Sequence, residues 1–228
     1  ALLRARCRWP FALVYVSVAL LALTLPRDKF AQLLVEQQGG RLVYFAEGVG
    51  NTVAVIEQGK GERRFRRLYI EGVSNTGDVM ASRRYMRLQT YLPLLLIEKP
   101  AQSALVIGLG TGITSGALLN VDSLNTRHVV ELLPEVVAAS RYFEGNYAVF
   151  DREDVQISIG DGRHELLRGQ RRYERITLEP PPPTAAGVND RFSSDFYELG
   201  TRRLETGGVL ALWGPLSRHA GDASRAWG

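Results

Sequence analysis

The sequence is poor in the residues that build disulfide frameworks and metal centres. It contains one cysteine, Cys7, and three histidines that lie far apart along the chain. One thiol cannot form an intramolecular disulfide, which fits a reducing compartment for the folded part. The histidines show no Cys/His ligand spacing, so neither a zinc site nor any other metal site is expected. A recognisable Ser/His/Asp arrangement is also lacking.

Long runs of one charge are lacking as well. The formal net charge is +4, but the arginines occur as short pairs separated by apolar or acidic residues. No basic run with interleaved aromatic side chains is present, so a nucleic-acid partner is not expected. The basic residues are interpreted as a solvated surface, and a face near anionic lipid is the second choice.

The longest uncharged run lies near the N-terminus. Residues 9–25 contain seventeen positions without a charge, with basic residues on both flanks. A helix of this length spans about 25 Å, at the short end for crossing a membrane. The preferred interpretation makes residues 1–30 a hydrophobic transmembrane helix and predicts a membrane localisation, with the α/β domain in the cytoplasm. A secretory signal and a buried core helix are the alternatives.

Residues 41–100 are predicted to form a small unit of β-hairpins followed by a helix. Short β-rich segments alternate with turns that contain glycine. The strands are expected at 41–45, 52–56 and 67–70. Over residues 79–96, apolar side chains recur every three or four positions, from Met80 to Leu95, which indicates a helix with Pro93 near its end.

From residue 101 the pattern changes to strands that alternate with helices. The strands are expected at 104–107, 128–131, 155–159, 175–178 and 209–213. Helices are expected at 134–142, with Pro134 at the start, and at 194–204, capped by Ser193 or Ser194. This alternation predicts an α/β fold with a mostly parallel, Rossmann-like sheet of the adenosylmethionine-methyltransferase type. Residues 101–228 are therefore expected to be a nucleoside-binding domain, cut short at its C-terminus because such a sheet usually has seven strands.

A glycine-rich turn follows the first of these strands. Gly108, Gly110 and Gly112 alternate, and Glu131 stands nineteen residues after Gly112. A strand, a glycine turn, a helix start and then an acid are typical of a nucleoside site, where main-chain N–H groups approach the ligand and the carboxylate accepts from ribose hydroxyls. Ile113 stands where the dinucleotide pattern has its third glycine. The alternating glycines therefore favour S-adenosylmethionine or a relative over a nicotinamide cofactor.

Acidic residues follow three successive strands. Glu131 comes after the second strand, Asp161 after the third and Glu179 after the fourth, where it is followed by four prolines. One acid in such a place is commonly a helix cap. Because the carboxyl ends of parallel strands meet at one edge of the sheet, we expect the three carboxylates to surround a single site.

These features resemble the spermidine synthase family, the polyamine aminopropyltransferases. The resemblance runs from about residue 44 to residue 215 and is closest to the membrane-associated branch, in which such a domain follows transmembrane helices. In chain order it is carried by Tyr91-Leu-Pro-Leu94, Val106–Gly112, Val130-Glu131, Asp161-Gly162, Tyr173–Glu179, Phe192–Tyr197 and Gly207–Leu210.

The resemblance implies a role for each of these positions. The glycine turn, with Thr111, and Glu131 would hold the adenosine of a co-substrate, decarboxylated S-adenosylmethionine or S-adenosylmethionine. Asp161 would accept a hydrogen bond from the adenine amino group, with the main chain of Gly162 beside it. Glu179 would deprotonate an amine acceptor, so that the amine can attack the carbon next to the sulfonium.

The chain departs from the family pattern at positions that bind a diamine. The family carries acids where this chain has Thr111 and Pro182, and His and Glu where it has Met86 and Arg87. A diamine carries two charges and needs carboxylates to replace its hydration. Weak or absent activity with putrescine is therefore expected.

Three functions remain open at this stage. The first is a transferase that moves an aminopropyl or a methyl group from an adenosyl sulfonium donor to an amine. The second is a nucleoside-sensing domain without catalysis that regulates a membrane part of the protein. The third is a nicotinamide-dependent oxidoreductase, which Ile113 disfavours. The expected partners are the small-molecule donor and acceptor and the membrane, and a homo-oligomer is left open.

Overall fold

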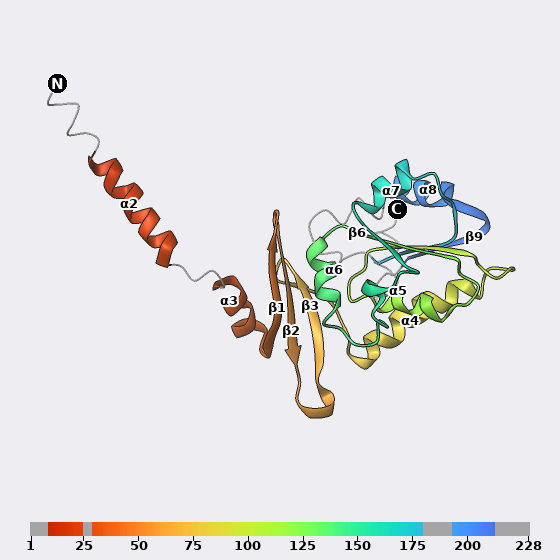
Figure 1. Ribbon diagram of the computed structural model, residues 1–228, viewed down its shortest axis with the longest axis horizontal. Coiled ribbons are helices and arrows are strands. Elements are labelled where there is room, and N and C mark those ends of the chain that lie inside the picture. Colours follow the sequence, from red (N-terminus) through yellow and green to blue (C-terminus); the bar gives the residue numbers. More distant parts are fainter. Residues whose placement is uncertain (1–8, 25–28, 180–192, 213–228) are drawn as a thin grey trace, which may run out of the picture. The chain divides into compact units, whose positions relative to one another are not determined.

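The structure is a computed structural model and describes residues 9–24, 29–179 and 193–212 (Figure 1). The chain divides into two compact units, Ala1–Arg41 and Leu42–Gly228. Within the described ranges, the first unit is helical, whereas the second contains a four-stranded and a five-stranded sheet.

The first unit contains helices α2 (Trp9–Thr24) and α3 (Lys29–Gln38). Helix α2 has 16 residues, which span about 24 Å, less than the roughly 30 Å of a bilayer core. In the described parts of the chain, no helix is long and apolar enough to cross a membrane. The described helices therefore give no support to the predicted transmembrane span, and the predicted membrane localisation is wrong. Helix α3 was not predicted, and it buries only Ala31 and Leu34.

The second unit begins with an antiparallel sheet, in the order β1-β2-β3-β4. Its strands are β1 (Arg41–Gly48), β2 (Asn51–Gln58), β3 (Phe65–Ile70) and β4 (Val73–Gly77), with the short 3-10 helix η1 (Gly61–Arg63) before β3. The predicted hairpin unit is confirmed for the first three strands. The fourth was missed because its sequence, Val-Ser-Asn-Thr-Gly, shows no alternation of apolar side chains.

Helix α6 (Pro134–Ser140) packs against this antiparallel sheet and starts at Pro134, as predicted. Val136 and Ala139 of the helix join a hydrophobic cluster with Val53 and Val55 of β2. The hairpin sheet is thus held to the α/β part by apolar packing.

The five-stranded sheet is wholly parallel and has the order β7-β6-β5-β8-β9. Its strands are β5 (Ser103–Ile107), β6 (Thr126–Glu131), β7 (Gln156–Ile159), β8 (Tyr173–Leu178) and β9 (Leu204–Leu212). All five predicted strands are present, and the α/β fold class is confirmed. The strand order reverses between β5 and β8, and ligands of such sheets bind at this point, beyond the carboxyl ends of the strands.

Helices cover both faces of the parallel sheet (Figure 1). Besides α6, the described helices of this part are α4 (Met80–Leu94), α5 (Ile113–Ala117), η2 (Leu118–Asn120), η3 (Val149–Asp151), α7 (Gly162–Arg168) and α8 (Ser194–Arg202). Helices α4 and α5 lie against one face and α7 and α8 against the other. Helix α8 is capped by Ser193, whose hydroxyl accepts a hydrogen bond from the main-chain N–H of Phe196.

Two hydrophobic cores fill these faces. Val106, Leu109 and Val129 belong to the core on the side of α5. Leu166 of α7 and Phe196 of α8 belong to the other core. The alternation of side chains along each strand separates the two sets.

The residues that α4 buries are not those of the apolar period predicted from the sequence. The side chains that it buries are Met86, Thr90 and Pro93. Among the apolar residues of the predicted helical period, Leu92 is 54% exposed and Leu95 79% exposed. The period located the helix correctly, but several of its apolar residues are exposed instead of packed against the sheet.

Candidate functional site

The glycine turn connects β5 to α5 and lies close to the end of β8. Gly108, Gly110 and Gly112 have φ angles of +94°, +54° and +78°, which are left-handed conformations. A Cβ atom on Gly108 would lie 2.7 Å from the main-chain oxygen of Glu179. Glycine is therefore needed at this position both for the conformation and for the approach to β8.

Glu131, at the end of β6, stabilises the glycine turn through its carboxylate. Its side chain is 7% exposed. The Oε2 atom accepts a hydrogen bond of 2.7 Å from the N–H of Leu109, and Oε1 accepts one of 3.0 Å from the N–H of Leu133. A carboxylate has about four acceptor sites, so two main-chain bonds leave capacity for a ligand. The predicted contact with ribose hydroxyls remains a prediction.

Asp161 follows β7 and is the N-cap of α7. Its Oδ1 atom accepts hydrogen bonds from the N–H groups of Arg163, at 2.6 Å, and His164, at 3.4 Å. The adjacent Gly162 lies so close to β5 that a Cβ atom there would be 2.2 Å from the Cγ2 atom of Ile107. The cap fixes the carboxylate, and its predicted contact with adenine is untested.

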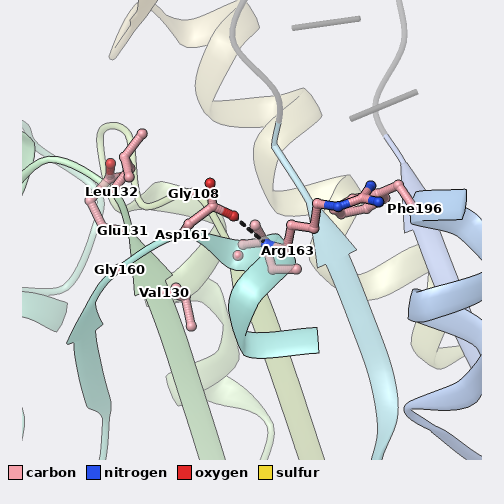
Figure 2. Close-up of a pocket in the computed structure, with 10 residues that line it drawn as sticks. Gly108, Val130, Glu131, Leu132, Gly160, Asp161, Arg163 and Phe196 are labelled. Atoms are coloured by element: carbon pink, nitrogen blue, oxygen red, sulfur yellow. Dashed lines mark hydrogen bonds between the residues drawn. The ribbon is translucent and has the colours of Figure 1, made fainter. Parts of the chain in front are cut away.

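A cavity opens where these segments meet (Figure 2). Its lining residues are Ile107, Gly108, Val130, Glu131, Leu132, Gly160, Asp161, Gly162, Arg163 and Phe196. The cavity combines apolar walls with two carboxylates, which suits a flat base joined to a sugar with hydroxyl groups. Figure 2 shows the Asp161 side chain beside the start of α7, with its bond to residue 163 as a dashed line.

Glu179 lies on the other side of the glycine turn, directly after β8. The hydroxyl of Thr114, in α5, donates a hydrogen bond to its Oε1 atom. Its Oε2 atom lies 3.7 Å from the position that a Cβ atom on Gly110 would take. Burial raises the pKa of Glu179 to about 7, against the opposing effects of the Thr114 hydrogen bond and of Arg175. A carboxyl with this pKa exchanges a proton readily at neutral pH.

Neutral side chains surround the turn near Glu179. The hydroxyl of Thr111 is buried and donates to the Sδ atom of Met86 at 3.3 Å. The hydroxyls of Thr76 and Tyr85 lie 3.5 Å apart. Burial, and to a smaller extent the charge of Glu179, raises the pKa of Tyr85. Thr111 therefore contributes to packing beneath the turn, and its hydroxyl does not face the cavity.

The comparison with protein families decides the assignment. A family model described as "Spermine/spermidine synthase domain" matches residues 83–214, more than half of the chain. The chain belongs to the spermine/spermidine synthase family. The resemblance noted in the sequence is thus confirmed at the level of the family, and the match does not separate its branches.

Relatives of known name include members of this family and a methyltransferase. The polyamine aminopropyltransferase of Thermoplasma volcanium is 32% identical over 127 residues, which cover 55% of this chain and 46% of that protein. Putrescine N-methyltransferase 2 of Nicotiana attenuata is 29% identical over 127 residues, which cover 55% of this chain and 34% of that protein. The chain therefore spans less than half the length of each of these relatives.

A solved structure with a similar fold is a spermidine synthase in complex with the transition state analogue AdoDATO. The TM-score is 0.66 and the sequence identity 22%, and the similarity covers 75% of this chain and 57% of the other. At this identity the comparison supports the fold.

The fold brings the predicted site residues of this spermidine synthase-family chain into two groups. Gly108, Glu131, Asp161 and Gly162 line the cavity. Gly110, Thr111 and Gly112 lie in the turn beside it, and Gly110 is near the carboxylate of Glu179. Pro182 lies outside the described residues.

Two neighbours of the site were missed by the sequence interpretation. Phe196 forms part of the cavity wall. The segment Phe192–Tyr197 contributes to the family resemblance, but no role was predicted for Phe196. Thr114 follows the glycine turn, and only the contact with Glu179 reveals its importance. Within the described ranges, no group of three or more His, Cys, Asp or Glu side chains is placed to hold a metal ion.

Proposed function

We propose that this chain is the nucleoside-binding and catalytic part of a transferase that uses an adenosyl sulfonium donor. Decarboxylated S-adenosylmethionine is the first choice of donor and S-adenosylmethionine the second. An aminopropyl or related group passes to an amine acceptor, with Glu179 as the base. The observation that carries the proposal is the position of Glu179, whose carboxylate lies against the same glycine turn that borders the cavity.

The cavity is the proposed site of the adenosine. Glu131 accepts from the ribose hydroxyls with the capacity that its main-chain bonds leave free, and Asp161 accepts from the adenine amino group. Ile107, Val130 and Phe196 provide apolar surface for the base. The spermidine synthase of similar fold is in complex with the transition state analogue AdoDATO, which is consistent with a ligand site in this fold.

The chemistry needs one proton acceptor and no acid. The amine nitrogen attacks the carbon bonded to the sulfonium, the C–S bond breaks, and sulfur keeps the electron pair as a neutral thioether. The proton that the amine must lose passes to the Glu179 carboxylate. A pKa of about 7 allows a useful fraction of this residue to be ionised at neutral pH. Positioning of the two reactants supplies much of the remaining acceleration.

The acceptor carries fewer charges than a diamine in this proposal. In the described part of the chain, the groups near Glu179 on the turn and α4 are neutral, namely Thr111, Met86 and Tyr85. In this proposal the remaining acceptor capacity of Glu131 is used by the ribose hydroxyls. A dication would therefore lose hydration without a second carboxylate to replace it.

Binding and turnover measurements on the full chain test the proposal. Calorimetry compares methylthioadenosine, S-adenosylmethionine, its decarboxylated form and NAD. The proposal expects binding of the adenosyl compounds and weak binding of NAD. Glu179→Gln should keep nucleoside binding and stop transfer to the amine. Nucleoside binding without turnover for any amine would support a sensing domain instead.

Methyl transfer is the second candidate function. The similarity to putrescine N-methyltransferase 2 favours it, because that relative covers the same share of the chain as the aminopropyltransferase. Thr111 supports it too, since a neutral turn is less repulsive toward the carboxylate of S-adenosylmethionine. Mass spectrometry of the acceptor product distinguishes the two transfers.

A further inference from the structure

Arg175, in the middle of β8, is a buried cation. Its side chain is 0% exposed. The Nη2 atom donates a hydrogen bond of 2.8 Å to the main-chain oxygen of Gln89 in α4. Its Nε and Nη1 atoms are buried and have no hydrogen-bond partner. A buried charge with unused donors is costly, so its presence calls for a compensating interaction.

Arg175 and Glu179 lie on the same side of the sheet. Side chains alternate along a strand, so residues 175, 177 and 179 share one side. Ile176 and Leu178 belong to the core on the opposite face. On their shared side, Arg175 reaches α4 through Gln89, and Glu179 reaches α5 through Thr114.

A polar layer joins the two ends of this arrangement. The Thr90 hydroxyl of α4 donates to the main-chain oxygen of Thr114 at 2.7 Å, which ties α4 to α5. The Thr177 hydroxyl and the side-chain amide of Gln89 are also buried without partners. Among the described residues, the layer between β8 and these helices thus contains the Arg175 cation, the Glu179 carboxyl, and polar groups of Gln89 and Thr177 without hydrogen-bond partners.

The two charged groups affect each other across this layer. Burial lowers the pKa of Arg175 to about 10, and the carboxylate of Glu179 opposes that decrease. Burial raises the pKa of Glu179, and Arg175 opposes that increase. Each group therefore opposes the effect of burial on the other, although no direct ion pair joins the two side chains in the described residues.

We propose that Arg175 is a positioning residue whose buried charge keeps Glu179 ionised. The consequence for catalysis rests on the proposed function, whereas the electrostatic pairing does not. Arg175 is too deeply buried to contact a substrate, so it acts through Glu179. In the described chain, the other titratable groups that face Glu179 are Glu131 at the end of β6, which opposes ionisation, and Tyr85 of α4, which is neutral below its raised pKa.

The first test is a stability titration that needs no activity. The unfolding free energy is measured between pH 4 and 10 with and without the substitution Glu179→Gln, first in the wild type and then in each Arg175 variant. The difference between the two measurements gives the contribution of Glu179 to stability. Folding raises the pKa of Glu179 to about 7. The contribution of this residue to stability is therefore complete below its pKa in the unfolded state, and it decreases as the pH rises to about 7. In Arg175→Met the decrease in stability should continue to a pH roughly one unit higher, because an opposite charge lowers the pKa of a carboxyl by about one unit or more.

Two further variants make this titration decisive. Arg175→Lys keeps the charge, so the stability contribution of Glu179 should become constant near the same pH as in the wild type. Arg175→Gln removes the charge and should behave like Arg175→Met. Arg175→Met removes a buried cation whose Nε and Nη1 atoms have no hydrogen-bond partner, and an apolar side chain of similar length is expected to leave the fold intact. Arg172→Met removes an exposed arginine just before β8 and is the matched control. The same levelling pH in wild type, Arg175→Met and Arg175→Gln would overturn the proposal.

The second test is the pH profile of transfer by the full chain. At pH 7, a shift of one unit in the pKa of Glu179 reduces its ionised fraction about fivefold. Arg175→Met should therefore lose about fivefold in rate at pH 7 and recover by pH 9, with unchanged nucleoside affinity. A loss that is equal at all pH values indicates a structural role and contradicts the proposal. If no amine is turned over at all, the proposed function fails, and the stability titration still decides the pairing.

Discussion

The Oε2 atom of Glu131 accepts a hydrogen bond of 2.7 Å from the main-chain N–H of Leu109. The acid at the end of β6 thereby fixes the loop at the end of β5, although the two residues belong to different strand ends. The same carboxylate lines the cavity. Stability of the turn and binding of a nucleoside are thus expected to depend on one side chain.

Replacement of Glu131 by alanine should therefore affect both properties. The change leaves the N–H groups of Leu109 and Leu133 without their acceptor, and we expect a loss of about 3 kcal/mol in unfolding free energy. Calorimetry should show no nucleoside binding under conditions where the variant is folded. Glu153→Ala removes an exposed acid and serves as the control. Retained nucleoside affinity in Glu131→Ala would exclude the ribose contact.

Glu179→Gln should separate binding from catalysis. The amide keeps the size of the side chain but cannot accept the proton of the amine, so we expect a rate loss of about 10²- to 10⁴-fold. In the wild type, the rate should rise with pH through about pH 7, as Glu179 loses its proton. Steady-state rates between pH 5.5 and 8.5 check both statements. A profile that is flat near pH 7, or a variant with wild-type rates, would rule out Glu179 as the base.

Restoring the family's acid in the turn should not restore diamine activity by itself. The Thr111 side chain is fully buried and donates to the Met86 sulfur, so Thr111→Asp places a charge without a partner in the packing beneath the turn. We expect a loss of about 3 kcal/mol in unfolding free energy. Thr111→Val, which keeps the shape, should cost about 1 kcal/mol or less, because sulfur is a weak acceptor. Chemical denaturation measures both, and a Thr111→Asp variant as stable as wild type and active on putrescine would contradict this account.

Gly108→Ala should damage the turn. Its φ of +94° is unfavourable for alanine, and the added Cβ atom would lie 2.7 Å from the main-chain oxygen of Glu179. We expect a cost of about 2 kcal/mol and a loss of transfer activity through displacement of Glu179. For stability, Gly160→Ala is the matched control, since a Cβ atom there meets nothing within 4 Å. Equal thermal stability of the two variants would show that the close approach is unimportant.

The parallel sheet and its ligand-binding edge were predictable from the sequence. The pattern consists of glycines at 108, 110 and 112 and an acid nineteen residues later. It indicates a strand, a tight turn and the end of a neighbouring strand, because consecutive strands of a parallel sheet commonly lie side by side. Pro134 and Ser193 marked helix starts in the same local way. The family resemblance followed from the order of these short motifs.

Which face of each element is buried depends on contacts between segments that are distant in the sequence. The apolar period of α4 suggested a buried stripe, yet Leu92 and Leu95 are exposed and Thr90 is buried. Neither the burial of Arg175 nor the contact between Thr114 and Glu179 could be inferred from local sequence patterns. Periodicity and spacing report on neighbours along the chain, whereas burial, pKa and charge pairing depend on residues brought together from distant segments.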